Sequence, residues 1–283
     1  MRSSIQPQLG FAHLAELPCW QLRCGEASAV VSSYGAQVLS YQPSPGDELL
    51  WLSPQANWQQ QAIRGGIPLC WPWFGPADPS ILPDAASQPA HGVARTRHWQ
   101  LLQQHCTESV AALTLHSIFT DLPHCPAPIE LQLAVRLSKE ALSVTLSSEQ
   151  PLPQQAALHS YFKLTSPQQL SVHGLGNHYL DKVSQQECLD GASPARLENE
   201  TDRIYLQAGS QLLVQDGAQG VVLQQSGHDS SVLWNPGPAK SKALKDVPDN
   251  AYQHFVCVET ASLNWQTAPL QLSQTIARQA ASR

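Results

Sequence analysis

A histidine and a glutamate of this chain each adjoin an apolar run, a setting in which a side chain can exchange protons away from bulk water. His159 lies in LHSYF, where an extended backbone would put it on one face with Tyr161. An imidazole there can act as a general acid or base near neutral pH. Glu259 ends FVCVE, and a carboxylate in that position is costly to bury unless it is paired or used. The structural alternatives are a core histidine bonded to a carbonyl group and a strand-end glutamate that reaches solvent.

A second set of residues could hold a polar or anionic ligand. Arg64 precedes two glycines, and a guanidinium beside glycine N–H groups suits an anionic oxygen. In HGVAR, His91 could donate to a ligand oxygen and Arg95 could add a second guanidinium. Asp202, in DRIYL, could accept a hydrogen bond from a ligand hydroxyl. The alternatives are a surface arginine at a turn, a hairpin with a satisfied histidine, and an aspartate that only pairs with Arg203.

The stretch RGGIPLCWPWFGP, residues 64–76, is rich in glycine, proline and aromatic side chains. Such a composition is incompatible with a long helix or a central strand, so it predicts a rigid loop that presents Arg64. Trp73 and Phe74 could form an aromatic wall that excludes water from a ligand, or could plug the core. Trp234, in WNPGP, could stack on a ligand or simply pack.

Positioning residues so far apart in sequence requires a large scaffold, and the hydrophobic pattern predicts one made of strands. Apolar residues alternate with polar ones at 131–137 and 142–146, and similar short runs recur at 38–41, 111–115, 211–214, 221–223 and 255–259. Turn residues separate these runs, which predicts an all-β antiparallel sandwich or barrel. We expect one domain over residues 1–283, a rim loop at 76–89, and helical turns at 55–62 and 274–281.

Composition excludes several functional classes. Charged residues make up 13% of the 283-residue chain and the formal net charge is −6, so no basic field exists to bind nucleic acid. Seven scattered cysteines without a CxxC motif predict free thiols in a reducing cytoplasm. We expect no signal peptide, no membrane association, no metal and no cofactor. Phosphate-binding loops, zinc-protease motifs and serine-hydrolase motifs do not occur in the sequence.

The segments described above, taken in order, resemble the motifs of one family. They are RGGIPLCWPWFGP, HGVAR, LHSYF, DRIYL, WNPGP and FVCVETA. They resemble the hexose-6-phosphate mutarotases, the glucose-6-phosphate 1-epimerase branch of the aldose 1-epimerase family. The resemblance extends from about Tyr34 to Ala261, and both order and spacing agree. It implies a galactose-mutarotase-like antiparallel β-supersandwich, in agreement with the strand pattern.

The resemblance also implies roles for individual residues near the reacting centre. By position in LHSYF and VETA, His159 and Glu259 correspond to the family's catalytic histidine and glutamate. By position in HG, His91 corresponds to a histidine that contacts the sugar.

Further residues are implied to bind the remainder of the substrate. Arg64 of RGG and Arg95 of HGVAR would contact the phosphate, and Asp202 would bind a sugar hydroxyl. This chain departs from the pattern at Ala90, where some relatives have a glutamine directly before HG. Gln88, two residues earlier, could supply the missing polar contact.

The implied reaction is the interconversion of the α and β anomers of a hexose 6-phosphate, with glucose 6-phosphate foremost. Glu259 would take the proton of the C1 hydroxyl while His159 protonates the ring oxygen, and closure would occur on the other face. The expected partner is a small-molecule sugar phosphate, bound by a monomer. Alternatives are a non-catalytic sugar-phosphate sensor, a mutarotase for neutral aldoses, and a carbohydrate hydrolase or lyase, which would require a second carboxylate.

Overall fold

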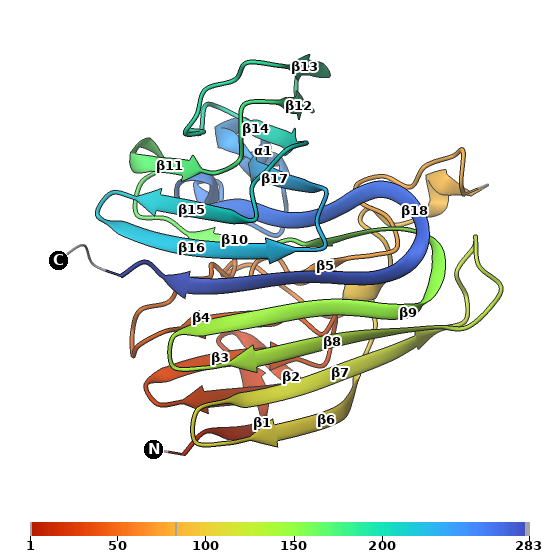
Figure 1. Cartoon of the computed structure of the whole chain (residues 1–283), viewed down its shortest axis with the longest axis vertical. Coiled ribbons are helices and arrows are strands. Elements are labelled where there is room, and N and C mark those ends of the chain that lie inside the picture. Colours follow the sequence, from red (N-terminus) through yellow and green to blue (C-terminus); the bar gives the residue numbers. More distant parts are fainter. Residues whose placement is uncertain (1, 83, 281–283) are drawn as a thin grey trace.

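The structure, a computed structural model, describes residues 2–82 and 84–280 and consists mainly of antiparallel strands (Figure 1). Its strands are β1 (Ser4–Phe11), β2 (Leu14–Cys24), β3 (Ala27–Ser32), β4 (Val38–Gln42), β5 (Leu69–Cys70), β6 (Gln100–Cys106), β7 (Ala111–Phe119), β8 (Ile129–Leu137), β9 (Ala141–Leu158), β10 (Tyr161–Lys163), β11 (Leu170–His173), β12 (Tyr179–Asp181), β13 (Gln186–Cys188), β14 (Thr201–Tyr205), β15 (Gln211–Asp216), β16 (Gln219–Ser226), β17 (Ser230–Asn235) and β18 (Phe255–Arg278). The helical elements are α1 (Gly237–Ala243) and the single 3₁₀ turns η1 (Ala85–Ser87), η2 (Ala94–Thr96), η3 (Pro167–Gln169) and η4 (Ala251–Gln253).

The strands form two sheets. The smaller sheet has the order β1-β2-β3-β4, and the larger one the order β13-β12-β14-β17-β18-β9-β8-β7-β6, with β5, β10, β11, β15 and β16 joined alongside. Every pairing between these strands is antiparallel in the described part of the chain. The all-β antiparallel architecture predicted from the sequence is therefore confirmed.

Alternation of apolar and polar residues accounts for the strands of the large sheet. In β8, residues 129, 131, 133, 135 and 137 are buried, while their neighbours are partly or fully exposed. The first half of β9 repeats this pattern, and its partly exposed alternate residues are Ala141, Ser143, Thr145 and Ser147. Because side chains alternate between the two faces, one face of the sheet packs on the core and the other meets solvent.

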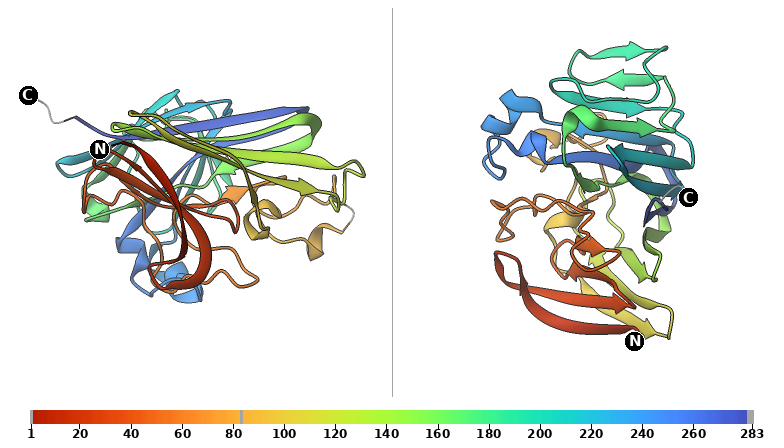
Figure 2. Two further views of the ribbon diagram at one scale, coloured as in Figure 1. Left: turned by 90° about the horizontal axis from the view of Figure 1, so that it is seen from below. Right: turned by 90° about the vertical axis from the view of Figure 1, so that its left-hand side faces the viewer.

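The small sheet covers the inner face of the large one. Figure 2 shows its strands, in red, beside the yellow and green strands of the large sheet, where β2 and β3 contact β7 and β8. Side chains from both sheets join one continuous apolar core that includes Val31, Tyr41, Leu113 and Leu133. Burial of this apolar surface is the main force that holds the two sheets together.

Two long strands, β9 and β18, run side by side through the centre of the molecule and bend together (Figure 1). The first part of β18 pairs with β10 and β17, whereas its last part pairs with β16. Register shifts in the β9–β18 ladder mark the bend. This bend brings the first part of β18 close to the end of β9.

Both predicted helical turns are wrong. Residues 55–62 form turns, because the Ser53 and Asn57 side chains accept the backbone N–H groups of Gln55 and Gln59. The segment 274–281 continues β18 through Arg278 as a strand with alternating burial, and position 281 lies outside the described residues. Period-two burial, set by pairing with β9 and β16, outweighs the weak helical pattern there.

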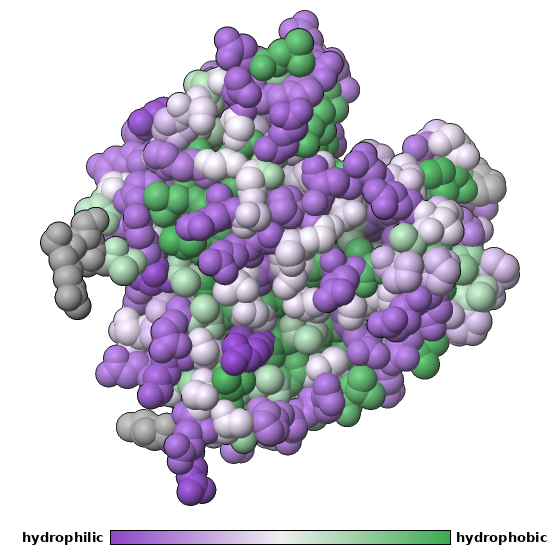
Figure 3. Space-filling view, viewed as in Figure 1, coloured by the Kyte–Doolittle hydropathy of each residue, from purple (hydrophilic) through white to green (hydrophobic). Residues whose placement is uncertain are grey.

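The outward face of the large sheet carries a mixture of residues. Hydrophilic and neutral residues cover most of the face seen in Figure 3, and hydrophobic ones are scattered among them. Within the described residues, no helix is both long and apolar enough to cross a lipid bilayer.

Candidate active site

One pocket of about 190 Å³ collects most of the residues selected from the sequence. Arg64, His91, His159, Asp202 and Glu259 all line it. They come from the loop after β4, the loop before η2, the junction of β9 and β10, and strands β14 and β18. Arg95 is the one predicted site residue that is not among the lining residues.

The imidazole of His159 and the carboxylate of Glu259 are in contact. His159 Nε2 lies 3.3 Å from Glu259 Oε1, and the two side chains are only 8% and 1% exposed. Glu259 sits within β18 opposite Val232 of β17, while His159 follows the last residue of β9. Two groups 100 residues apart in sequence thus meet because β9 and β18 are neighbours in the sheet.

Burial favours the uncharged form of both partners. Desolvation, followed by coulombic interactions with His91, Arg95 and Arg64, lowers the pKa of His159 well below 6.5. Desolvation, followed by the negative field of Asp202, raises the pKa of Glu259 well above 4.5. Both shifts widen the pH range in which the pair holds one proton and no net charge. His159 Nδ1 and Glu259 Oε2 are buried without a partner among the described residues, so both remain free for a ligand.

His91 is held in an unusual backbone conformation at the edge of the pocket. Its φ is +65°, and its N–H donates to Gly75 O at 2.7 Å. Gly75 N donates to His91 Nδ1 at 3.3 Å, which leaves the proton of the neutral ring on Nε2. Desolvation, then the positive fields of Arg95 and Lys182, lowers the pKa of His91 to about 3. The ring is consequently a neutral hydrogen-bond donor, and the strained backbone at His91 sets the direction of the side chain.

Arg64 lines the pocket, and two neighbouring side chains hold its guanidinium in place. Its Nε donates to Asp246 Oδ2 at 2.9 Å and its Nη1 donates to Tyr161 Oη at 2.9 Å. Nη2 has no hydrogen-bond partner in the described part of the chain. The adjacent Gly65 and Gly66 have φ of +111° and +63°, and a Cβ on Gly66 would lie 2.2 Å from Val38 O. The glycines therefore allow the close chain approach that places this arginine.

Arg95 lies behind the rim of the pocket. It belongs to η2, and its Nη2 donates to Ala90 O at 2.6 Å. Ala90 does line the pocket, whereas Gln88 does not. Binding of a phosphate by Arg95 and replacement of the missing glutamine by Gln88 both stay predictions.

Asp202 and Arg203 point to opposite faces of β14, as neighbours in a strand do. Arg203 pairs with Glu198 at 3.1 Å and lies 3.5 Å from Asp181, so Asp202 is not its partner. Desolvation raises the pKa of Asp202, partly offset by Lys182 and Lys240. Its carboxyl lies in the pocket as a possible acceptor for a ligand hydroxyl.

The pocket also contains two lysines, Lys182 and Lys240, that were not predicted from the sequence. Lys240 donates to Glu200 at 2.6 Å. No carboxylate lies within ion-pair distance of Lys182 Nζ among the described residues, and this Nζ lies 5.9 Å from the centre of the Phe74 ring. Lys182 lies in the loop after β12 and Lys240 in the last turn of α1, and neither belongs to a motif, so only the fold places them here.

The aromatic wall consists of Phe74 and Trp234 rather than Trp73. Phe74 and Trp234 line the pocket, and the Trp234 ring centre lies 6.0 Å from that of His159. Trp73 is fully buried beneath the loop, where its Nε1 donates to Pro89 O. Residues 64–76 thus supply both Phe74, which lines the pocket, and Trp73, which packs in the core.

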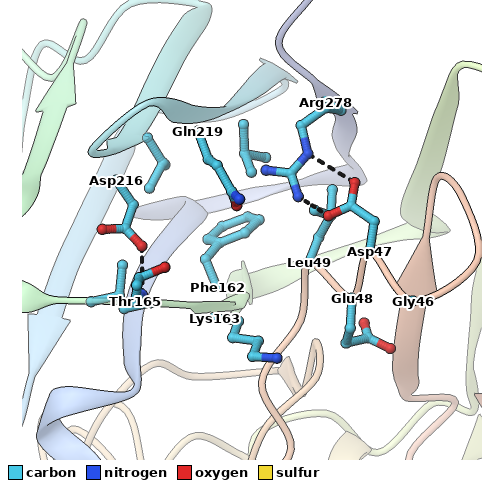
Figure 4. A pocket seen from close by; sticks show the side chains of 13 residues that line it. Gly46, Asp47, Glu48, Leu49, Phe162, Lys163, Thr165, Asp216, Gln219 and Arg278 are labelled. Atoms are coloured by element: carbon cyan, nitrogen blue, oxygen red, sulfur yellow. Dashed lines mark hydrogen bonds and ion pairs between the residues drawn. The ribbon is translucent and has the colours of Figure 1, made fainter.

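A second, larger cavity of about 240 Å³ opens near the end of β18 (Figure 4). Arg278 forms a two-bonded ion pair with Asp47 at its edge, and Asp216 accepts the backbone N–H of Thr165. None of the residues selected from the sequence lines this cavity. Across the described residues, no group of three or more histidines, cysteines or carboxylates is arranged to hold a metal ion.

Comparisons with known proteins agree with this architecture. A family model described as aldose 1-epimerase matches residues 18–276. A protein of Escherichia coli (strain K12), provisionally named a glucose-6-phosphate 1-epimerase, is 35% identical over 265 residues, covering 91% of this chain and 87% of that protein.

Solved structures resemble the whole chain. The Salmonella typhimurium protein YeaD, provisionally described as a mutarotase, has a TM-score of 0.86 at 29% identity, covering 99% of this chain and 97% of that one. A galactose mutarotase-like protein of Clostridium acetobutylicum has a TM-score of 0.72 at 12% identity, with 98% and 99% covered. The predicted galactose-mutarotase-like fold is thereby confirmed.

Proposed function

This chain belongs to the aldose 1-epimerase family, and on that premise we propose that it interconverts the α and β anomers of a hexose 6-phosphate, glucose 6-phosphate foremost. The observation that carries the proposal is the buried contact of 3.3 Å between His159 Nε2 and Glu259 Oε1 in a pocket that also contains cationic side chains. The hydroxyl oxygen and the ring oxygen of a hemiacetal are bonded to the same carbon. Acid and base must therefore be adjacent, as these two groups are.

The reaction needs one proton to move in each direction. Transfer of the shared proton from Glu259 to His159 creates a carboxylate and an imidazolium without changing the net charge of the pair. Glu259 then takes the proton of the C1 hydroxyl, His159 protonates the ring oxygen, and the bond between C1 and the ring oxygen breaks to give the aldehyde. Rotation about C1–C2 and the reverse transfers close the ring on the other face. General acid–base groups of this kind contribute about 10²- to 10⁴-fold each.

The remaining pocket residues are proposed to hold the substrate in place. His91 Nε2–H and the carboxyl of Asp202 suit sugar hydroxyls, and Phe74 and Trp234 exclude water from one side. For the phosphate we propose Arg64, through its free Nη2, together with the positive charge of Arg95 behind the rim. Such binding far from C1 would orient the reacting carbon against the acid and base.

Two further features of the protein belong to the same proposal. All seven cysteines are free thiols, which supports action in the cytoplasm. That the functional unit is a monomer stays a prediction.

Two-dimensional exchange NMR on equilibrated glucose 6-phosphate tests the activity directly. We expect catalytic amounts of protein to accelerate exchange between the anomers, and His159→Asn or Glu259→Gln to remove about 10²- to 10⁴-fold of that acceleration. Circular dichroism must show that both variants remain folded. If exchange continues at the original rate in both variants, this assignment of acid and base is wrong.

A second candidate is a mutarotase for neutral aldoses. It is favoured by the ion pair that already engages Arg64 and by the position of Arg95 outside the lining residues. The same NMR measurement on glucose, galactose and their 6-phosphates decides between the two candidates. A phosphate preference that is lost in Arg64→Ala supports the hexose 6-phosphate, whereas equal rates for phosphorylated and neutral sugars support the second candidate.

A further inference from the structure

A chain of buried polar side chains lies behind the candidate catalytic pair. Ser160 follows His159 and Thr260 follows Glu259, and successive residues of an extended chain point to opposite faces. Ser160, Thr260 and Gln274 have no exposed surface. A buried polar group is costly unless it is hydrogen-bonded, so the partners of these three side chains are informative.

One amide joins the residues behind the two catalytic candidates. Ser160 Oγ donates to Gln274 Oε1 at 2.5 Å, and Gln274 Nε2 donates to Thr260 Oγ1 at 2.8 Å. Thr260 Oγ1 donates onward to Gln225 Oε1 at 3.0 Å, and Gln225 Nε2 donates to Ser231 Oγ at 2.8 Å. From Ser160 through Gln274 and Thr260 to Gln225 Oε1 the donors run in one direction, and Ser231 Oγ donates back to the same Gln225 Oε1 at 3.1 Å.

The position of His159 makes such a connection important. His159 and Ser160 lie between the end of β9 and the start of β10, so neither belongs to a named strand. Glu259 and Gln274 lie on the two parts of β18 that are separated by its bend. The network therefore ties the β9–β10 junction to both parts of β18, directly behind the contact between imidazole and carboxylate.

We propose that Gln274 is a positioning residue for the reaction. By holding Ser160 and Thr260 at a fixed separation, its amide sets the distance between His159 and Glu259 on the other face of the sheet. The kinetic part of this inference rests on the proposed anomerase function. The structural part, a fixed contact between the two side chains, does not.

Three variants at two glutamines separate positioning from a general loss of stability. Gln274→Met keeps a similar volume but leaves the Ser160 hydroxyl and Thr260 Oγ1 without this partner. Gln274→Glu is the conservative variant, because a buried carboxyl stays protonated and can accept from Ser160 and donate to Thr260. Gln154→Met is the matched control.

The control removes a different buried amide, one that joins β9 to β18. Gln154 lies on β9 and is 5% exposed, and its Oε1 accepts from Trp71 Nε1 at 2.6 Å. Its Nε2 donates to Ala268 O of β18 at 2.7 Å. It therefore resembles Gln274 as a buried amide with a hydrogen bond to β18, but has no bond to either residue behind the catalytic pair.

The measurements are steady-state exchange kinetics on glucose 6-phosphate and the NMR titration of the His159 imidazole without substrate. We expect Gln274→Met to lower kcat about 10- to 100-fold, as a misplaced group does, with KM changed less than about twofold. The His159 titration should shift relative to that of the unaltered protein, since its contact with Glu259 changes. Gln274→Glu should retain both properties, and Gln154→Met should leave both unchanged.

Other results would overturn the inference. Unchanged kcat and an unchanged His159 titration in Gln274→Met would do so, and so would equal losses in Gln154→Met. If the unaltered protein fails to accelerate anomer exchange, only the proposed function is lost, and the titration comparison still decides whether Gln274 positions the pair.

Discussion

The chemistry proposed for this pocket depends on where a single proton resides between His159 and Glu259. Burial lowers the pKa of the imidazole and raises that of the carboxyl, which widens the pH range over which the pair keeps that proton. His91 differs, since its low pKa of about 3 keeps it neutral throughout that range.

We expect a bell-shaped pH profile for the exchange rate with a broad plateau. On the acid side, activity falls when the pair takes a second proton, at a pH below the ordinary value for histidine because the pKa of His159 is lowered. On the alkaline side, activity falls when the pair loses its one proton. Exchange rates measured from about pH 5 to about pH 9 check this. A sharp rise of activity through the ordinary histidine pKa would contradict it.

The same carboxyl also predicts a dependence of stability on pH. A group whose folded pKa is raised contributes stability below its unfolded value, here 4.5, and loses it as pH rises through the folded pKa. The Glu259→Gln variant has no carboxyl at this position, so it does not lose stability with rising pH in this way. We expect the Tm of the variant to rise relative to the Tm of the unaltered protein as the pH increases. Thermal unfolding followed by circular dichroism measures both Tm values. A difference that is constant with pH would mean that Glu259 titrates normally.

At the scale of elements, the loops around β5 carry positions that tolerate little change. Gly92 has a φ of +75°, and a Cβ there would lie 2.0 Å from Trp71 O. The loop that contains His91 therefore lies directly against residues 71 and 72 of the preceding loop. This close backbone approach helps to hold the two parts of the pocket wall together.

Gly92→Ala is expected to lower the free energy of unfolding by about 1–3 kcal/mol and to reduce exchange activity, because His91 must move. Gly46→Ala is the matched control. Gly46 also has a positive φ, +84°, but nothing lies within 4 Å of its Cβ position. Chemical denaturation should show a smaller loss for this control, and its activity should be unchanged. Equal losses in both variants would show that backbone strain alone, without the clash, accounts for the effect.

At the scale of the whole molecule, β18 connects the site to the far end of the large sheet. It begins beside the pocket, and at its last residue Arg278 pairs with Asp47, in the loop after the small sheet. The ion pair is partly buried, with side chains 26% and 31% exposed. It therefore joins the two sheets at the edge of the second cavity (Figure 4).

Arg278→Ala is expected to lower the free energy of unfolding by about 1 kcal/mol without affecting exchange activity. The control is Asp121→Asn, which removes a more exposed ion pair. In that pair the side chain of Arg97 is 42% exposed and that of Asp121 is 60% exposed. That change should have almost no effect, because water screens such pairs. Thermal unfolding at low and high salt measures both. A loss of activity in Arg278→Ala would show instead that the two ends of β18 are coupled.

The sequence by itself determined the strands and most of the pocket residues, because period-two burial and short motifs are local properties of the chain. It failed where local signals were weak or absent. Residues 274–281 suggested a helix until pairing with β9 and β16 imposed a strand, and Lys182 and Lys240 belong to no motif. Only the tertiary structure placed Trp73 in the core and Arg95 behind the rim, since depth depends on which segments pack above a residue. The contact of His159 with Glu259, and the shared amide of Gln274 behind them, likewise arise from the pairing and bending of two distant strands.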